Sequence, residues 1–210
     1  MNRPLFCLPA FALVAALIAP VPVFAQEEDE SPIEEEIGRE VPTYSPGDFI
    51  LGVNAGLFIP MFYYGGPDGV EDANLTLGGT GHIYYGGYLS NNVAVGGEIG
   101  GSFSFSPNDN TLYMLLIAGR YTYFLRRFPF EFPLSVSAGF NFSRFGENFK
   151  TDPAITPSVG VLWNLNAQWG FGFDVRYWWV PQIYRGPSPP SDESRVGNFL
   201  STTLSLAYRF

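Results

Sequence analysis

The stretch that decides the fold runs from Leu134 to Ser143 and reads LSVSAGFNFS. Every second residue, beginning with Leu134, is apolar, and the residues between them are Ser, Gly or Asn. A second stretch, Gln168 to Trp179, reads QWGFGFDVRYWW and has six apolar residues on one parity and one on the other. A period of two is typical of a β-strand with one apolar face. Both stretches are therefore predicted to be strands.

The same period recurs along residues 49–210 and predicts eight strands in all. The other six are marked by alternate apolar residues in Leu51 to Ile59, Leu75 to Leu89, Val93 to Phe105, Tyr113 to Leu125, Ile155 to Trp163 and Val196 to Phe210. Short turns are expected at 90–92, 126–131 and 164–167. Longer loops are expected at 60–74, 106–110, 146–153 and 181–195. One end with short turns and one with longer loops is the asymmetry of a bacterial outer-membrane barrel, whose long loops lie outside the cell.

Residue size indicates which face of the strands points outward. A water-soluble sandwich or lipocalin-like barrel would bury the apolar parity. Here the other parity consists mainly of Gly, Ser, Thr and Asn, which suits a narrow interior, whereas the apolar parity is large and aromatic, which suits a lipid-facing exterior. Strands of roughly 10 to 15 residues also suffice to cross a bilayer. The predicted fold is all-β, an eight-stranded antiparallel up-and-down transmembrane β-barrel.

Composition excludes several classes of function. Aromatic residues make up 17% of the 210 residues and charged residues only 15%, whereas soluble domains have about 25% charged residues. The net charge is -9, which argues against a basic nucleic-acid-binding surface. The single cysteine is Cys7 and the single histidine is His82, so a disulfide framework, a cysteine-based metal site and a multi-histidine metal site are excluded. No cofactor is expected.

The first 48 residues differ in composition from the rest. Arg3 precedes a mostly apolar stretch ending at Ala25, so residues 1–25 are predicted to be a removed signal peptide. The alternative is a transmembrane anchor, which four prolines in the stretch disfavour. Residues 26–48 contain nine acidic residues and are predicted to form an acidic, disordered periplasmic leader. A tail that binds a basic partner is the alternative for this segment.

The final strand ends in Tyr208, Arg209 and Phe210, and resembles the C-terminal signal of outer-membrane proteins, which closes on Tyr-x-Phe. The body, residues 49–210, is similar in architecture to the small eight-stranded group that includes OmpX, the OmpA membrane domain and OmpW. The resemblance implies a bacterial outer-membrane location, and an even number of strands returns both termini to the periplasm. The resemblance also implies assembly by periplasmic chaperones and the barrel-assembly machinery, with outer-membrane lipid around the barrel.

Charged residues on the inward parity indicate a polar network in the lumen. Glu98 and Arg120 lie at similar depths in neighbouring predicted strands, so we expect them to touch, because inward charges are costly unless paired. His82, Asp174 and Arg176 are expected to join them near the middle of the membrane. The network has two readings, a polar plug that fills a narrow barrel and an ion-conducting path or gate.

Near the outer mouth, the inward parity is apolar. The residues are Phe58, Leu112, Met114, Leu116, Trp178 and Val180. OmpW-like proteins are associated with an apolar lumen that admits small hydrophobic solutes, so the resemblance suggests narrow, apolar small-molecule passage. The alternative is that these residues pack together where the strands project beyond the bilayer, and that the barrel has a structural role.

Two further functions have different signals. Thr80 and Tyr84, not serines, lie two positions from His82, so the His-x-Ser pattern of lipid A deacylases is missing and no enzyme is expected; a lipid-modifying enzyme is a remote alternative. Loops 60–74 and 181–195 carry Tyr63, Tyr64 and Tyr184, and exposed loops on a rigid barrel suit adhesion to host surface molecules. Adhesion is therefore the main alternative to passage.

Overall fold

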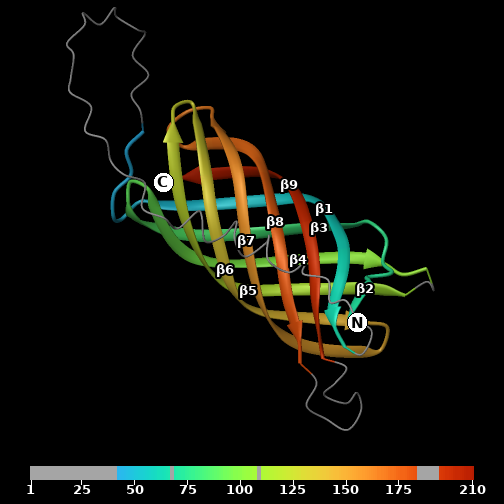
Figure 1. Cartoon of the computed structure of the whole chain (residues 1–210). Coiled ribbons are helices and arrows are strands. Elements are labelled where there is room, and N and C mark those ends of the chain that lie inside the picture. The colour runs from blue at the N-terminus through green and yellow to red at the C-terminus, as the bar shows by residue number, and fades with distance from the viewer. Residues whose placement is uncertain (1–41, 67–68, 108–109, 184–193) are drawn as a thin grey trace, which may run out of the picture. The chain divides into compact units, whose positions relative to one another are not determined.

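The chain forms a closed antiparallel barrel (Figure 1). The computed structural model describes residues 42–66, 69–107, 110–183 and 194–210. Consecutive long strands pair with each other, and the last pairs back with the first, so eight strands close the barrel as predicted. The strands are β1 Phe49–Gly65, β2 Val70–Asp72, β3 Gly78–Ser90, β4 Val93–Phe105, β5 Thr111–Arg127, β6 Phe130–Phe145, β7 Asn148–Asn164, β8 Trp169–Gln182 and β9 Arg195–Arg209.

The short strand β2 is an addition to the predicted topology. It pairs only with the far end of β1, where Phe62 lies opposite Asp72. Within the described residues, no helix is long and apolar enough to cross a membrane. We call the end with the connections 91–92, 128–129 and 165–168 the turn end, and the opposite end the loop end.

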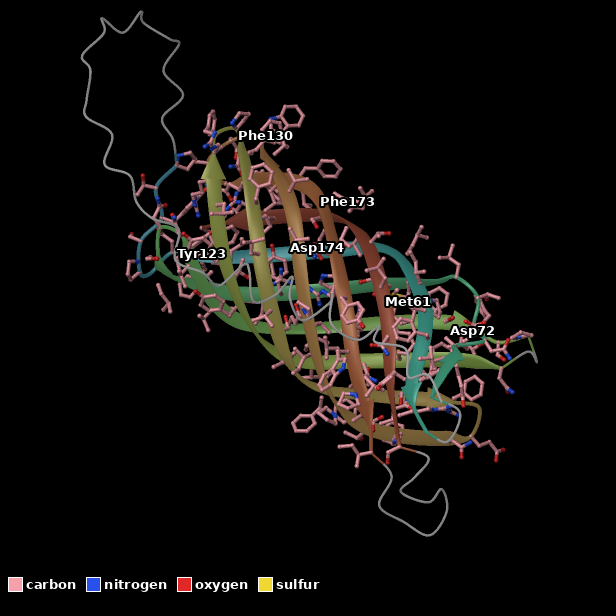
Figure 2. All side chains as sticks on the ribbon, viewed as in Figure 1. Met61, Asp72, Tyr123, Phe130, Phe173 and Asp174 are labelled. Carbon is pink, nitrogen blue, oxygen red and sulfur yellow. The ribbon has the colours of Figure 1, made fainter. Side chains whose placement is uncertain are left out.

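Burial alternates along the strands with the predicted period. In β5, residues from Leu112 to Leu125 are buried and exposed in strict alternation, with Arg120 inside and Tyr121 outside. In β8, Phe173 projects from the outer face while its neighbour Asp174 lies inside the barrel (Figure 2). The outer wall, by which we mean the outward-facing side of all eight long strands, therefore carries the large apolar residues. The sequence prediction of an inside-out barrel is confirmed.

Glycine on the inward face lets the strands approach closely in this narrow barrel. Gly96 in β4 is the clearest case, because a Cβ atom built there would collide with the backbone of Tyr85 and Gly86 in β3. Gly97, the next residue, points outward, and the nearest atom to a Cβ there would be the carbonyl oxygen of Ala118 at 3.7 Å. Strand spacing thus requires glycine at the inward position 96 but not at the outward position 97.

Three predicted connections are shorter than expected because the paired strands extend into the ranges that were predicted to be loops or turns. The predicted loop 60–74 contains the end of β1 and all of β2. The predicted loop 146–153 reduces to residues 146–147, since β7 begins at Asn148, and the predicted turn 126–131 reduces to 128–129. Prolines such as Pro60 and Pro153 suggested loops there, yet the ladder includes them. In the other direction, Leu75 and Leu77 precede β3 instead of belonging to it.

Aromatic side chains meet on the outer wall at both ends of the barrel. At the turn end, Phe210 packs on Phe49 and Tyr208, with ring centroids 5.9 and 5.7 Å apart, and Tyr208 packs on Trp169 at 4.6 Å. At the loop end, Phe103 contacts Phe105 at 5.6 Å. Aromatic residues at both ends of an apolar outer wall are typical of membrane-spanning barrels.

Candidate functional site

A buried ion-pair network crosses the middle of the lumen. The Glu98 carboxylate of β4 accepts a hydrogen bond from Arg120 Nη1 on the neighbouring β5 at 2.9 Å. It also pairs with Arg176 on β8, which donates to both carboxylate oxygens, from Nη2 to Oε2 at 3.1 Å. Glu98 is 3% exposed and Arg176 is 1% exposed. One carboxylate therefore joins β4 and β5 to β8 across the interior.

The other predicted members lie around this centre. Arg176 Nη2 donates to His82 Nε2 at 3.1 Å, and the Asn54 side-chain amide contacts the same nitrogen. A guanidinium only donates, so Nε2 is the acceptor and the imidazole proton is on Nδ1. Asp174 Oδ1 lies 4.0 Å from Arg176 Nε. The structure thus brings together all five residues of the predicted polar network.

Arg120 is held by hydroxyl groups as well as by Glu98. Its Nε donates to Thr122 Oγ1 at 3.2 Å and its Nη2 donates to Ser135 Oγ at 2.9 Å. Two arginines face Glu98 and Asp174, so the charges of the network balance. A balanced, hydrogen-bonded network is the arrangement in which buried charges are tolerated, and separating it is costly.

The predicted apolar residues form one cluster at the loop end of the lumen. All six belong to it, and Phe58, Leu116 and Trp178 are 0% exposed. The Phe58 ring meets Trp178 edge-on at 5.9 Å, and Trp178 Nε1 donates to Ser201 Oγ at 3.1 Å. The side chains fill this part of the interior by packing against one another.

Sequence reasoning missed Phe199, which completes this cluster. Its ring stacks on Phe58 at 5.2 Å and meets Tyr63 edge-on at 6.0 Å. Phe199 is on the inward parity of β9 together with Ser201, so the period of two in the sequence could have predicted that Phe199 points into the lumen. Tyr63, predicted to lie in an adhesive loop, is instead part of β1 and also lies under the Arg195 guanidinium at 4.4 Å.

A second ion-pair network, also missed, closes the turn end of the lumen. Arg209 pairs with Glu131 and donates to Asn164 Oδ1 at 3.1 Å and to the Tyr88 hydroxyl at 3.2 Å. Arg126 pairs with the other oxygen of Glu131 at 3.0 Å. Extending the alternation of β6 back past Ser135 places Glu131 on the inward parity. Assigning Glu131 to a turn concealed this signal.

Tyr44, from the segment before β1, sits over the turn-end network. Its ring is 8% exposed and stacks on Tyr88 with centroids 4.8 Å apart, and the Arg126 guanidinium lies 4.4 Å from its centroid. Its hydroxyl donates to the Ala167 carbonyl at 2.6 Å, and its backbone N–H donates to Asn91 Oδ1 at 3.0 Å. Burial raises the pKa of the Tyr44 phenol above its usual value. Tyr44 thus closes the lumen at this end.

Comparison with known proteins places the chain in a family. One protein-family model, whose description states no fold or function, matches residues 27–208. The chain belongs to that family. A protein of Borreliella burgdorferi described as an uncharacterized protein is similar to it, with 27% identity over 178 residues, which cover 74% of this chain and 80% of the relative.

Solved structures share the fold of this family member at low sequence identity. Neisserial surface protein A (NspA) is 13% identical and superimposes with a TM-score of 0.53, covering 78% of this chain and 97% of its own. The outer membrane protein OprG from Pseudomonas aeruginosa is 13% identical with a TM-score of 0.51, covering 81% of this chain and 99% of its own. The likeness is to small outer-membrane β-barrels and concerns the fold.

The described residues show what surrounds the single histidine and the acidic side chains of this family member. His82 contacts Asn54 and Arg176, neither of which is a nucleophile. In the described part of the chain, no three His, Cys, Asp or Glu side chains gather in a way that would hold a metal ion. Three layers of side chains occupy the lumen. They are an apolar layer at the loop end, an ion-pair network in the middle and a second ion-pair network at the turn end.

Several sequence predictions fall outside the described residues. The signal peptide at 1–25, most of the acidic leader at 26–48, and Tyr184 of the predicted adhesive loops are among them. The leader prediction included residues 42–48, which the structure does describe. There, Tyr44 is buried and the Asp48 carbonyl accepts a hydrogen bond from the Tyr88 N–H of β3 at 2.9 Å, so this part is packed against the barrel.

Proposed function

We propose that this protein is an integral outer-membrane protein of a bacterium and that its barrel is a closed structural support. An outer wall of exposed apolar residues between two aromatic bands supports insertion in a bilayer. In this proposal both termini lie in the periplasm, because the first and last long strands begin and end at the turn end, and the longer connections face outward. The C-terminal Tyr208 and Phe210 are recognised by the barrel-assembly machinery.

The observation that best supports a closed lumen is the position of Glu98 between Arg120 and Arg176. These three side chains connect opposite sides of the wall in the middle of the barrel, where a steady pore would need open space. The layers on either side, around Trp178 and around Arg209, are buried as well. An eight-stranded barrel is just wide enough for side chains to fill it, which agrees with this arrangement.

Passage of small apolar molecules and adhesion through the loops are the alternatives. The loop-end cluster has the lining that apolar passage requires, but Trp178 is packed on all sides. An apolar ligand that entered there would have to displace Phe58 or Phe199 from their ring contacts. Quenching of Trp178 fluorescence by a short-chain detergent, with the fold intact, would favour passage over the structural role.

Planar-bilayer recording from the refolded full chain tests the closed lumen. The expected result is no stepwise conductance, whereas Arg176→Ala, which removes the link from Glu98 to β8, is expected to allow brief openings. Stable channels in the unchanged protein would contradict the proposal. Retention of the chain in urea-washed outer membranes is the accompanying test of location.

A test of assembly compares two aromatic residues at the turn end. Phe210→Ser is expected to lower the amount of folded barrel in the outer membrane of an expressing cell. Phe130→Ser, which alters an exposed aromatic of β6 at the same end, is the matched control. Equal levels for both variants would remove Phe210 from the proposed signal.

A further inference from the structure

The outer wall has a groove of about 500 Å³ at the loop end, across β4, β5, β6 and β7. It is lined mainly by apolar side chains, among them Phe103, Leu115, Phe142 and Phe149. It is open along the wall and not enclosed. Because most of its side chains belong to the outward parity, the groove faces the surroundings of the barrel and not the lumen.

Gly101 is the reason for the hollow. It lies on the outward face of β4, directly opposite Leu115 of β5, and Leu115 in turn lies opposite Phe142 of β6. A Cβ atom at Gly101 would have only one neighbour within 4 Å, the Met114 carbonyl oxygen at 3.9 Å. A side chain is therefore missing at a point of the outer wall where space allows one, between the large side chains of Phe103 and Leu115.

Arg144 supplies a positive charge at the rim of this groove. It is an exposed residue on the outward parity of β6, and it lies between Tyr113 of β5 and Phe149 of β7 in one cross-strand row. Its Nε donates to the Gly146 carbonyl at 3.1 Å. Among the described residues, Arg144 takes part in no ion pair, although Glu147 is close in the chain. Its terminal nitrogens are the groups left for an anionic ligand.

We propose that the groove binds one anionic membrane lipid, whose acyl chain lies over Gly101 and whose phosphate pairs with Arg144. The inference rests on the proposed membrane location. An arginine at the edge of the aromatic band is at the depth of lipid headgroups, where guanidinium and phosphate form strong charge-assisted hydrogen bonds. The apolar groove below it suits an acyl chain, so both parts of the ligand meet the matching chemistry.

Native mass spectrometry of the full mature chain tests the site. The protein is reconstituted in bilayers containing equal phosphatidylglycerol and phosphatidylcholine, released into mild detergent, and examined for bound lipid. The unchanged protein is expected to retain one phosphatidylglycerol in preference to phosphatidylcholine. Arg144→Gln should reduce that preference about five- to tenfold, as expected from loss of one headgroup contact. Gly101→Leu, which fills the hollow, should reduce retention of either lipid.

Two matched controls make the result specific. Arg127→Gln removes another exposed arginine, at the turn end of β5. Gly97→Leu adds the same side chain at another outward position of β4, where a Cβ atom makes only an ordinary contact with the Ala118 carbonyl oxygen at 3.7 Å. Both should behave like the unchanged protein. A uniform lipid preference across all five proteins overturns the lipid site, and so does glycerol 3-phosphate competing as well as the lipid. A chain that fails to enter bilayers overturns the proposed function together with the site.

Discussion

At the scale of the single residue, Glu98 is the position on which the middle network depends. Glu98→Gln keeps the size of the side chain but leaves Arg120 and Arg176 buried without their shared carboxylate. Breaking a buried ion pair by removing one partner costs about 3–5 kcal/mol. We expect the free energy of unfolding to fall by that amount, measured by tryptophan fluorescence during urea unfolding from lipid vesicles.

Glu71→Gln is the control for that experiment. Glu71 pairs with Arg195 at 3.7 Å, and both side chains are 38% exposed. Exposed pairs contribute under about 1 kcal/mol, so this variant should unfold almost like the unchanged protein. If Glu98→Gln and Glu71→Gln lower the free energy of unfolding equally, the middle network does not stabilise the barrel.

Tyr44 offers a second test at this scale. Tyr44→Ala removes a ring that stacks on Tyr88 and lies beneath Arg126, and should lower the free energy of unfolding by about 2–4 kcal/mol. Tyr44→Phe keeps the ring and loses only the hydrogen bond to Ala167, which is worth about 1 kcal/mol. Urea unfolding of both variants measures the difference. Identical losses would mean that the ring does not seal the turn end.

The sequence revealed the residues of the middle network and the apolar cluster because they lie inside long, regular alternations. It did not reveal the turn-end network, because Glu131 and Arg209 are at the ends of strands, where alternation stops being distinguishable from turn chemistry. Tyr44 could not be found at all from periodicity. It belongs to no strand, and its role comes from a chain reversal that brings it over the barrel opening.

At the scale of the element, the spacing of β3 and β4 depends on inward glycine. Gly96→Ala places a methyl group against the backbone of Tyr85 and Gly86, so the strands must separate. Such overpacking typically costs about 1–3 kcal/mol. Gly97→Ala, one residue along on the outer wall, places a methyl group 3.7 Å from the Ala118 carbonyl oxygen, an ordinary van der Waals contact, and should change stability by no more than about 0.5 kcal/mol.

The unfolding temperatures of these two variants can be compared by gel electrophoresis. Samples are incubated at increasing temperature, loaded without boiling, and the band of the folded barrel is followed. The Gly96 variant should lose its folded band at a lower temperature than the Gly97 variant. The reverse order would show that the inward spacing is not limiting. Strand number was predictable from the alternation, but strand ends were not, since the pairing of β7 with β6 continues through residues such as Lys150 and Pro153 that alone suggest a loop.

At the scale of the whole molecule, the two faces of the barrel wall differ in polarity, and this difference indicates that the outer face contacts lipid. Phe173 and Asp174 are adjacent in β8, yet the first lies in the apolar outer wall and the second in the polar interior (Figure 2). A soluble barrel would place them the other way round. The outer wall is therefore suited to an apolar solvent, whereas the polar side chains of the interior bind one another.

Replacing an outer-wall residue with arginine at two depths tests this claim directly. Phe173→Arg alters the middle of β8 and should lower the free energy of unfolding from lipid vesicles by about 2–4 kcal/mol, because a charge then faces acyl chains. Phe105→Arg alters the loop end of β4, where headgroups and water are near, and should cost about 0–1 kcal/mol. Equal, small costs at both positions would mean that no bilayer surrounds the wall, because only a hydrocarbon layer distinguishes the two depths.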